Sequence, residues 1–334
     1  MSKRYDAVII GGGHNGLVCA FYLARAGYRV RILERRHIVG GAAVTEEFHP
    51  GFRNSVASYT VSLLHPKVIE DMKLAAHGYR VIERPIANFL PQPDGRYLKV
   101  GGGLERTQAE FARFSAKDAA ALPAYLDALE VVADLLRDMM LKTPPNAGDG
   151  LSMVMAALAQ GRRVGALSLE QKRDVLDLFL KSARSFLDGW FENEAVKAAF
   201  AFDAIVGNYA SPDTPGSAYV LLHHVFGQVN GKKGAWGHCV GGMGAITQIM
   251  ARVVAAMGVE ISLDAPVARV LIDGQRVTGV RLDSGEEVMG AAVITNVGPK
   301  LLYERMMVRE AHRGVQGGIG QLPHECRAVG AARL

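Results

Sequence analysis

The chain has 334 residues, 49% of them hydrophobic and 7% aromatic, which is enough for a sizeable core and, by length, about two domains. The formal charge of +5 includes six basic and three acidic residues in 300–334, and no basic stretch is interleaved with aromatic residues, so we expect no nucleic-acid partner. No apolar run approaches the ~18 residues of a membrane span. The N-terminus enters a strand pattern at once, without a signal or transit peptide, and we expect a cytoplasmic location.

Three cysteines, Cys19, Cys239 and Cys326, lie far apart in the sequence. They form no CxxC pair and show no metal-ligand spacing. This argues against a disulfide framework, a dithiol redox centre and a metal site.

The first 34 residues follow the order strand, glycine turn, helix, strand. After an apolar run over 6–10, the positions of a GxGxxG motif are filled by Gly11, Gly13 and Gly16. Such glycines allow, in turn, a tight turn, a close approach of backbone to a pyrophosphate, and close packing of the helix on the strand. The second strand, "RVRIL", ends at Glu34, where a carboxylate can accept hydrogen bonds from a ribose. This unit predicts dinucleotide binding.

The choice of dinucleotide depends on the residues that follow Glu34. Its charge disfavours a 2'-phosphate, but Arg35 and Arg36 leave NADP open. Gly40 and Gly41 then form a second glycine pair, for which an ordinary NAD-binding unit has no need. A second approach of backbone to the same ligand would require such a pair.

The stretch "GGGHNGLVCAFYLARAGYRVRILERRHIVGGAAVTEEFHPGF" resembles the opening of the FAD-dependent amine oxidase and phytoene desaturase superfamily. "GHNGLV" and "SYTVSLLHP" are similar to its pyridine nucleotide-disulfide oxidoreductase domain-containing branch, whose eukaryotic members are mitochondrial. The resemblance implies an adenosine ribose on Glu34 and pyrophosphate or ribose contacts on Arg36. It also implies cofactor contacts at Asn15, Gly40, Gly41 and Ala42.

Residues 86–234 read as a mainly helical substrate or cap domain, inserted between residues 1–85 and 235–300 of the FAD-binding domain. Helical periodicity before residue 143 is expected to be interrupted near Pro123. Further helices are expected over 151–160, 169–187 and 217–226.

The segment after residue 234 supports a flavoprotein. "GAWGHCVGGMGAI" resembles the second glycine-rich segment of the superfamily and places Gly242 near the cofactor. The sequence from Val259 to Thr295 has strand patterns separated by tight turns at residues 273–274 and 283–285, as in a β-meander. By resemblance, the backbone of Val267 bonds the adenine. The expected fold is α/β, an FAD-binding Rossmann-type parallel sheet with a β-meander.

After Pro299 the resemblance is expected to fade. Residues 301–334 show no sustained period and are expected to form a disordered, atypical tail. We therefore expect a C-terminally truncated member that lacks the isoalloxazine half of its site and is inactive if that segment is essential.

The predicted function is FAD-dependent hydride abstraction from, or desaturation of, an apolar or amphipathic small organic molecule. An NAD(P)-binding reductase is one alternative, and a non-catalytic binding or regulatory protein or a gene fragment is another. No catalytic residue is predicted, and the oligomeric state stays open. Tyr59, His65 and Tyr219 are candidates for lining a substrate path, with ordinary core or surface roles as the alternative.

Overall fold

A computed structural model describes residues 4–145 and 150–307, which divide into two compact units. Of the described residues, the first unit contains 4–61, His65–Ile82 and 238–307, and the second contains Ser62–Leu64, 83–145 and 150–237. The chain passes between them along β5 (Val81–Glu83) and β10 (Gly237–Cys239), which pair as a two-stranded sheet. The observed boundaries lie beside the predicted 85/86 and 234/235, except that residues 62–64 belong to the second unit.

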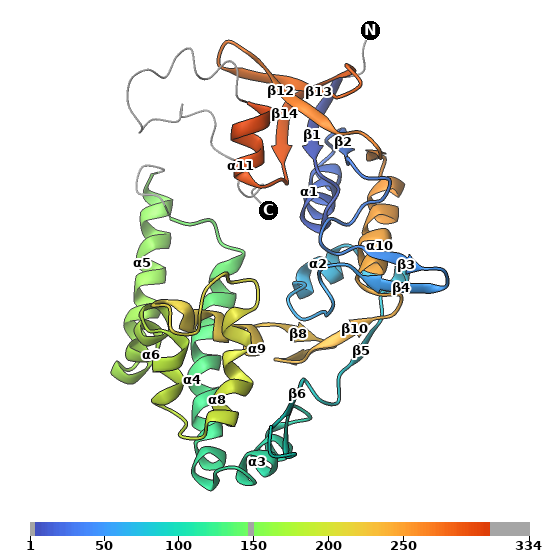
Figure 1. Cartoon of the computed structure of the whole chain (residues 1–334). Coiled ribbons are helices and arrows are strands. Elements are labelled where there is room, and N and C mark those ends of the chain that lie inside the picture. The colour runs from blue at the N-terminus through green and yellow to red at the C-terminus, as the bar shows by residue number, and fades with distance from the viewer. Residues whose placement is uncertain (1–3, 146–149, 308–334) are drawn as a thin grey trace. The chain divides into compact units, whose positions relative to one another are not determined.

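The first unit is built on a six-stranded sheet in the order β11-β2-β1-β14-β13-β12 (Figure 1). Neighbours among the first four strands run parallel, and the last two add antiparallel pairs. The fold prediction, an α/β parallel sheet with a β-meander, is therefore confirmed. The strand bounds are β1 (Arg4–Ile10), β2 (Val30–Leu33), β11 (Glu260–Ser262), β12 (Val267–Asp273), β13 (Arg276–Leu282) and β14 (Glu287–Thr295).

The strand β14 belongs to both parts of this sheet. Its first residues pair with β13, and the stretch from Met289 to Thr295 pairs with β1. The meander and the parallel part of the sheet thus share this one strand. Its final residues, "AAVIT", pair with β1 and are mostly apolar or β-branched, as is common in strands.

Helices cover the sheet because alternate strand residues are apolar on both faces. Helices α1 (His14–Arg25) and α10 (Met243–Ala256) pack against each other, and α1 contacts β1 and β2. In β1, Ile9 is fully buried, while Val8 and Ile10 belong to a separate core cluster that includes the meander. Successive strand residues point to opposite faces, so β1 contributes to the core on both sides.

The chain after the sheet continues as a helix. The three residues of α11 (Pro299–Leu301) lead into a π-helical turn, η5 (Leu302–Met306). Met306 is buried in the cluster formed with the meander. The predicted disordered tail is therefore wrong for residues 301–307, because apolar residues spaced four apart reach the same hydrophobic surface. The rest of that tail lies outside the described residues.

A carboxylate ties the short helix α2 (Pro66–Asp71) to α1 in the first unit. Asp71 Oδ2 accepts hydrogen bonds of 2.8 Å from Lys67 Nζ and from the Tyr22 hydroxyl, and Arg25 Nη1 lies 3.5 Å from Oδ1. The Lys67 ammonium and the Tyr22 hydroxyl hold the pKa of Asp71 below its usual value. Burial, followed by the hydrogen bond to Asp71, raises the pKa of Tyr22 to about 12. A 3-10 turn, η1 (Leu74–His77), follows α2.

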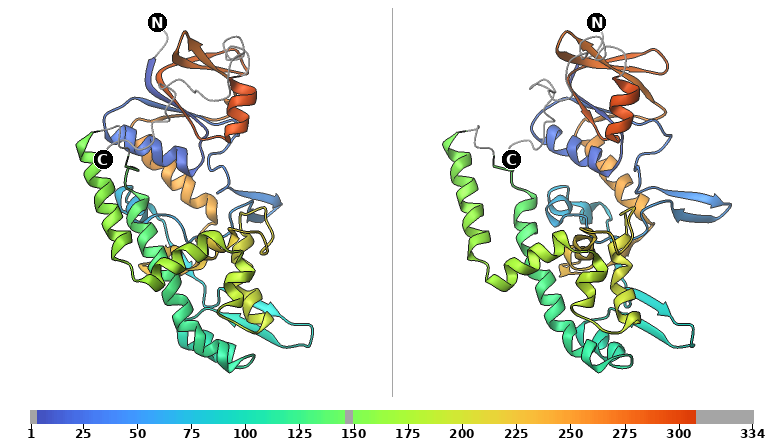
Figure 2. Two further views of the ribbon diagram at one scale, coloured as in Figure 1. Left: turned by 90° about the vertical axis from the view of Figure 1, so that its left-hand side faces the viewer. Right: turned by 60° about the vertical axis from the view of Figure 1, so that its left-hand side comes forward.

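The second unit is mainly helical, as predicted, around a cluster of aromatic residues that includes the fully buried Tyr125 and Phe111. The helices of the second unit are α3 (Leu104–Ala112), α4 (Ala116–Met140), α5 (Leu151–Ala166), α6 (Leu169–Leu180), α7 (Ala183–Asp188), α8 (Glu194–Ala201), η3 (Asp203–Ile205), η4 (Ser217–Leu222) and α9 (His223–Phe226). Its hairpins are β6 (Asn88–Pro91) with β7 (Tyr97–Val100) and β8 (Gln228–Val229) with β9 (Lys232–Lys233). Helix α5 lies beside α4 (Figure 2), where the Arg163 guanidinium pairs with Asp138.

Pro123 does not interrupt its helix, contrary to the prediction. The break comes earlier, between α3 and α4, where Ser115 caps α4 by accepting a 3.1 Å bond from Asp118 N. Pro123 lacks the N–H that would bond the carbonyl of Ala119. The side chain of Gln108 supplies a substitute, because its Nε2 donates to that carbonyl at 2.9 Å.

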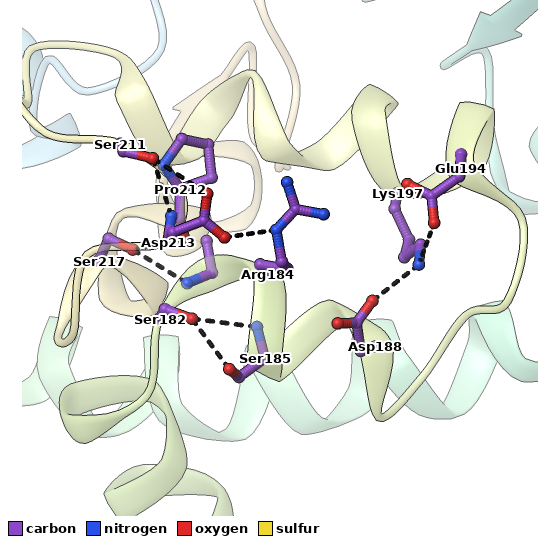
Figure 3. A network of polar contacts seen from close by, with 11 residues as sticks. Ser182, Arg184, Ser185, Asp188, Glu194, Lys197, Ser211, Pro212, Asp213 and Ser217 are labelled. Atoms are coloured by element: carbon purple, nitrogen blue, oxygen red, sulfur yellow. Dashed lines mark hydrogen bonds and ion pairs between the residues drawn. The ribbon is translucent and has the colours of Figure 1, made fainter.

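The predicted helix over 169–187 is divided into α6 and α7 by a serine network (Figure 3). Ser182 Oγ caps α7 by accepting from Ser185 N at 3.1 Å. Ser217 Oγ, which is buried, accepts from Ala183 N at 2.9 Å and donates to Pro212 O at 3.2 Å (Figure 3). These bonds attach the turn before η4 to the first residues of α7.

Candidate cofactor site

The first glycine turn joins β1 to α1. Gly11 adopts a φ of +100°, which L-residues rarely adopt, and its N–H donates to Leu33 O at 2.8 Å. Gly13 is the N-cap of α1. A Cβ on Gly16 would lie 2.3 Å from the carbonyl oxygen of Gly11, so any side chain there would push the helix off the strand. Gly11 and Gly16 thus have the steric reasons that the sequence suggests, and the approach of Gly13 to a pyrophosphate stays a prediction.

The acid at the end of β2 is held in place by backbone donors. Glu34 is only 6% exposed; its Oε2 accepts from Gly12 N at 2.8 Å and its Oε1 from Arg36 N at 3.0 Å. A carboxylate has about four lone-pair positions, so two remain for the hydroxyls of a ribose. The glycine turn therefore orients the group that the sequence assigns to the ribose.

The second glycine pair lies directly over the first turn. Gly40 N donates to Gly12 O at 2.9 Å, and Gly40 forms an isolated parallel bridge with Gly13. Gly41 has a φ of +58°, and a Cβ there would lie 3.2 Å from the Cα of Gly13. Residues 40 and 41 thus bring a second stretch of side-chain-free backbone to the start of α1, as a ligand held between two backbone segments requires.

The second glycine-rich segment packs against the loop after Gly41. A Cβ on Gly242, the N-cap of α10, would lie 2.4 Å from Thr45 Oγ1. Thr45 Oγ1 accepts from Gly244 N at 2.9 Å, and Thr247 Oγ1 bonds Ala43 O at 3.1 Å. Gly242 was predicted to approach the cofactor. In the structure it lies against β3 (Thr45–His49), where it helps to position that loop, and its contact with the cofactor stays a prediction.

Three other predicted contacts have protein partners or an exposed place. The guanidinium of Arg36 pairs with Glu46. Ala42 accepts a 3.1 Å bond from Ser58 N through its carbonyl. Asn15 lies exposed in the first turn of α1. Binding by these residues stays a prediction.

Val267 is the first residue of β12, and the loop before it is hydrogen-bonded to Glu34. Two residues earlier, Ala265 N donates to the carbonyl of Glu34 at 2.9 Å. The strand that would supply the adenine contact therefore starts beside the residue assigned to the adenosine ribose. The structure agrees with that placement, and the contact itself stays a prediction.

Asn296 is a candidate that sequence reasoning missed. It follows the carboxyl end of β14, and its N–H donates to Ile10 O at 2.9 Å. A Cβ on Gly13 would lie 3.0 Å from the Asn296 amide nitrogen, so this side chain borders the glycine turn. Its place just after a parallel strand is the signal that could have identified it, since ligands bind there in open α/β sheets.

A pocket of about 470 Å³ opens at the N-terminal end of α10, lined among others by Thr45, Arg53, Ser55, Tyr59, His238 and Met243. Of the three candidates for a substrate path, Tyr59 thus lines a pocket. His65 caps α2 instead, because its Nδ1 accepts from Lys67 N at 3.1 Å. Tyr219 stacks on Phe179 in the second unit.

Comparison with known proteins decides the family. A model of the flavin containing amine oxidoreductase family matches residues 16–324. The chain belongs to the flavin-containing amine oxidoreductases. The match runs well beyond residue 299, where the resemblance was expected to fade, so that expectation was wrong. The cofactor prediction, FAD, is confirmed at the level of the family, and an NAD(P)-binding reductase loses its support.

Individual proteins agree with the family assignment. The chain is 38% identical to the pyridine nucleotide-disulfide oxidoreductase domain-containing protein 2 of Rattus norvegicus over 329 residues, which cover 93% of this chain and 56% of that protein. It is 26% identical to the neurosporene-forming phytoene desaturase of Cereibacter sphaeroides, covering 92% of this chain and 55% of that one. Wild-type putrescine oxidase bound to putrescine shares the fold, with a TM-score of 0.57 and 19% identity over 92% of this chain and 60% of that one. This flavoprotein chain thus spans about half the length of the curated relatives it matches.

Other chemistries find little support among the described residues of this flavoprotein. Cys19 and Cys239 are both unpaired thiols, and burial raises the pKa of each. That disfavours the reactive thiolate that dithiol chemistry needs, whatever the name of the rat relative. Within residues 4–145 and 150–307, no group of acidic, histidine or cysteine side chains has the arrangement of a metal site. No helix of the described residues is long and apolar enough to cross a bilayer.

Proposed function

We propose that this chain binds FAD and belongs to an oxidoreductase that removes a hydride from a small apolar or amphipathic organic molecule. The observation that carries the proposal is the close approach of Gly41 to Gly13 beside the oriented carboxylate of Glu34. The family description names a flavin, and one relative is a desaturase, both of which support the proposal.

The residues of the chain have separate parts in this proposal. Glu34 accepts hydrogen bonds from the adenosine ribose, and the backbone of Gly13 and Gly41 borders the pyrophosphate, at the positive end of the α1 dipole. FAD supplies the hydride acceptor when bound. The protein contributes orientation, since a buried carboxylate that accepts two hydrogen bonds is fixed before the ligand arrives.

The experiment that tests the proposal compares two glutamate variants. Glu34→Gln removes the charge and half of the acceptor capacity from the ribose site, and we expect FAD affinity to fall at least about tenfold, or about 1.4 kcal/mol. Glu287→Gln is the control, because Glu287 pairs with Arg281 on the exposed meander. The measurements are the visible flavin spectrum of the purified protein, FAD titration and circular dichroism.

Two results would contradict the proposal. One is a parent protein that is colourless and cannot be reconstituted with added FAD. The other is a folded Glu34→Gln variant that keeps FAD as tightly as Glu287→Gln does. Hydride transfer is tested separately, by anaerobic bleaching of the bound flavin with apolar and amphipathic organic donors.

A further inference from the structure

The pocket at the end of α10 has a cationic side chain placed by the β3–β4 hairpin. Thr45 in β3 lies opposite Ser55 in β4 (Phe52–Ser55), and their hydroxyls accept from the first amides of α10, at 2.9 Å and 3.1 Å. Residues two apart in a strand share a face. Arg53 therefore lies on the same face of the hairpin as Ser55, next to the start of α10, and it lines the pocket.

The side chain of Arg53 forms no hydrogen bond or ion pair with any residue in the described part of the chain. Its cross-strand neighbour is Glu47, but Glu47 Oε1 accepts a 3.1 Å bond from Gly51 N in the hairpin turn. By contrast, Arg36, close by in the sequence, is paired with Glu46. An unpaired guanidinium in a pocket presents several donors in a plane, the geometry that suits a carboxylate.

The electrostatic setting of the pocket also favours an anion. Gly242 and Met243, at the N-terminal end of the 14-residue helix α10, line it, and this end carries the positive pole of the helix dipole. Met243 N is already bonded to Ser55, so the helix contributes its field and Arg53 supplies the direct donors.

Part of the pocket lining can hold a hydrocarbon portion, beside the polar Asn54 and His238. Tyr59, Cys239 and Met243 contribute to its lining. A volume of about 470 Å³ is within the range of small-molecule sites.

We propose that this pocket binds an amphipathic organic acid, with its carboxylate on Arg53 and its hydrocarbon against Tyr59 and Met243. That this acid is the substrate rests on the proposed function, whereas the binding itself does not. The substrate class of the enzyme is thereby narrowed from apolar or amphipathic molecules to amphipathic carboxylates.

The experiment uses decanoate as the probe, with decan-1-ol as the uncharged analogue, in isothermal titration of the purified full chain. The parent protein should bind decanoate more tightly than decan-1-ol. Arg53→Gln should weaken decanoate binding at least tenfold and abolish the preference over decan-1-ol. Arg276→Gln, at the exposed start of β13, is the matched control and should behave as the parent. Thermal melts check that all variants are folded.

Equal binding of the acid and the alcohol by the parent, no binding of decanoate, or undiminished decanoate binding by Arg53→Gln would each overturn the inference. FAD content, measured on the same samples, separates the two proposals. A parent without FAD but with Arg53-dependent decanoate binding contradicts only the proposed function. A parent that holds FAD and binds decanoate independently of Arg53 contradicts only the carboxylate site.

Discussion

Replacing Gly41 by alanine tests whether the two glycine turns form one cofactor cradle. Gly41 has a φ of +58° and would place a Cβ 3.2 Å from the Cα of Gly13. Gly274, in the turn between β12 and β13, has a φ of +59° and no atom within 4 Å of its Cβ position. Gly274→Ala therefore carries the same backbone strain without the close approach.

The expected magnitudes follow from this pair. Each alanine should cost about 1 kcal/mol of stability for the left-handed backbone. For a unit of this size that lowers the melting temperature by about 2–4 °C. At Gly41 alone, the new methyl group must also move the backbone of Gly13 by a few tenths of an ångström, because the contact is shorter than an ordinary van der Waals distance. Both walls of the cradle are then displaced.

The assay is FAD titration with thermal melts of both variants. Gly41→Ala should lose FAD affinity by at least about tenfold, or about 1.4 kcal/mol, while Gly274→Ala keeps the parent affinity. Equal FAD affinity in the two variants would refute the reasoning, since the approach of the second glycine turn would then have no part in holding the cofactor.

Three further outcomes are expected. Gln108→Ala should destabilise the helical unit by about 1 kcal/mol, because it leaves a helix carbonyl unpaired. The loss should be smaller in a Pro123→Ala background, which restores the missing N–H. A double-mutant cycle of urea unfolding measures the difference. The pKa of Asp71 is lowered in the folded protein, so its contribution to the free energy of unfolding is present above the unfolded pKa of about 3.9. That contribution is lost as the pH falls through the folded pKa. Asp71→Asn should reduce the loss of stability at acidic pH. It should also lower the pKa of Tyr22 from about 12, which ultraviolet titration of the tyrosinate measures. Ser217→Ala should cost about 1–3 kcal/mol in denaturant melts, because a buried amide loses its acceptor; an unchanged midpoint would contradict this.

The parts of the fold that sequence alone predicted are those fixed by local rules. The strand, glycine turn and helix around Gly11 follow from backbone angles that only glycine adopts readily and from helical spacing of apolar residues. The turn at Gly274 likewise defines two strands of the meander. Each of these features depends on a few consecutive residues.

The features that sequence reasoning missed depend on residues far apart in the chain. Thr45 and Gly244, whose bond positions the second glycine segment, are separated by 199 residues. The predicted interruption of the helix at Pro123 does not occur, because Gln108, from a different helix, replaces the missing donor. In each case a side chain from another element overrides a local rule, and a single sequence does not show which elements will meet.

The proposed pyrophosphate cradle depends on both chain segments that flank the helical unit. Thr247 is fully buried and bonds the carbonyl of Ala43, and Thr45 bonds Gly244, so α10 holds the loop that contains Gly41. Without these bonds the loop would be attached to the first glycine turn mainly through the bond from Gly40 to Gly12. The residues proposed to contact FAD and those that fix their geometry therefore belong to different parts of the sequence. A motif of glycines near the N-terminus is then necessary for the site, but its shape is completed only when α10 packs against β3.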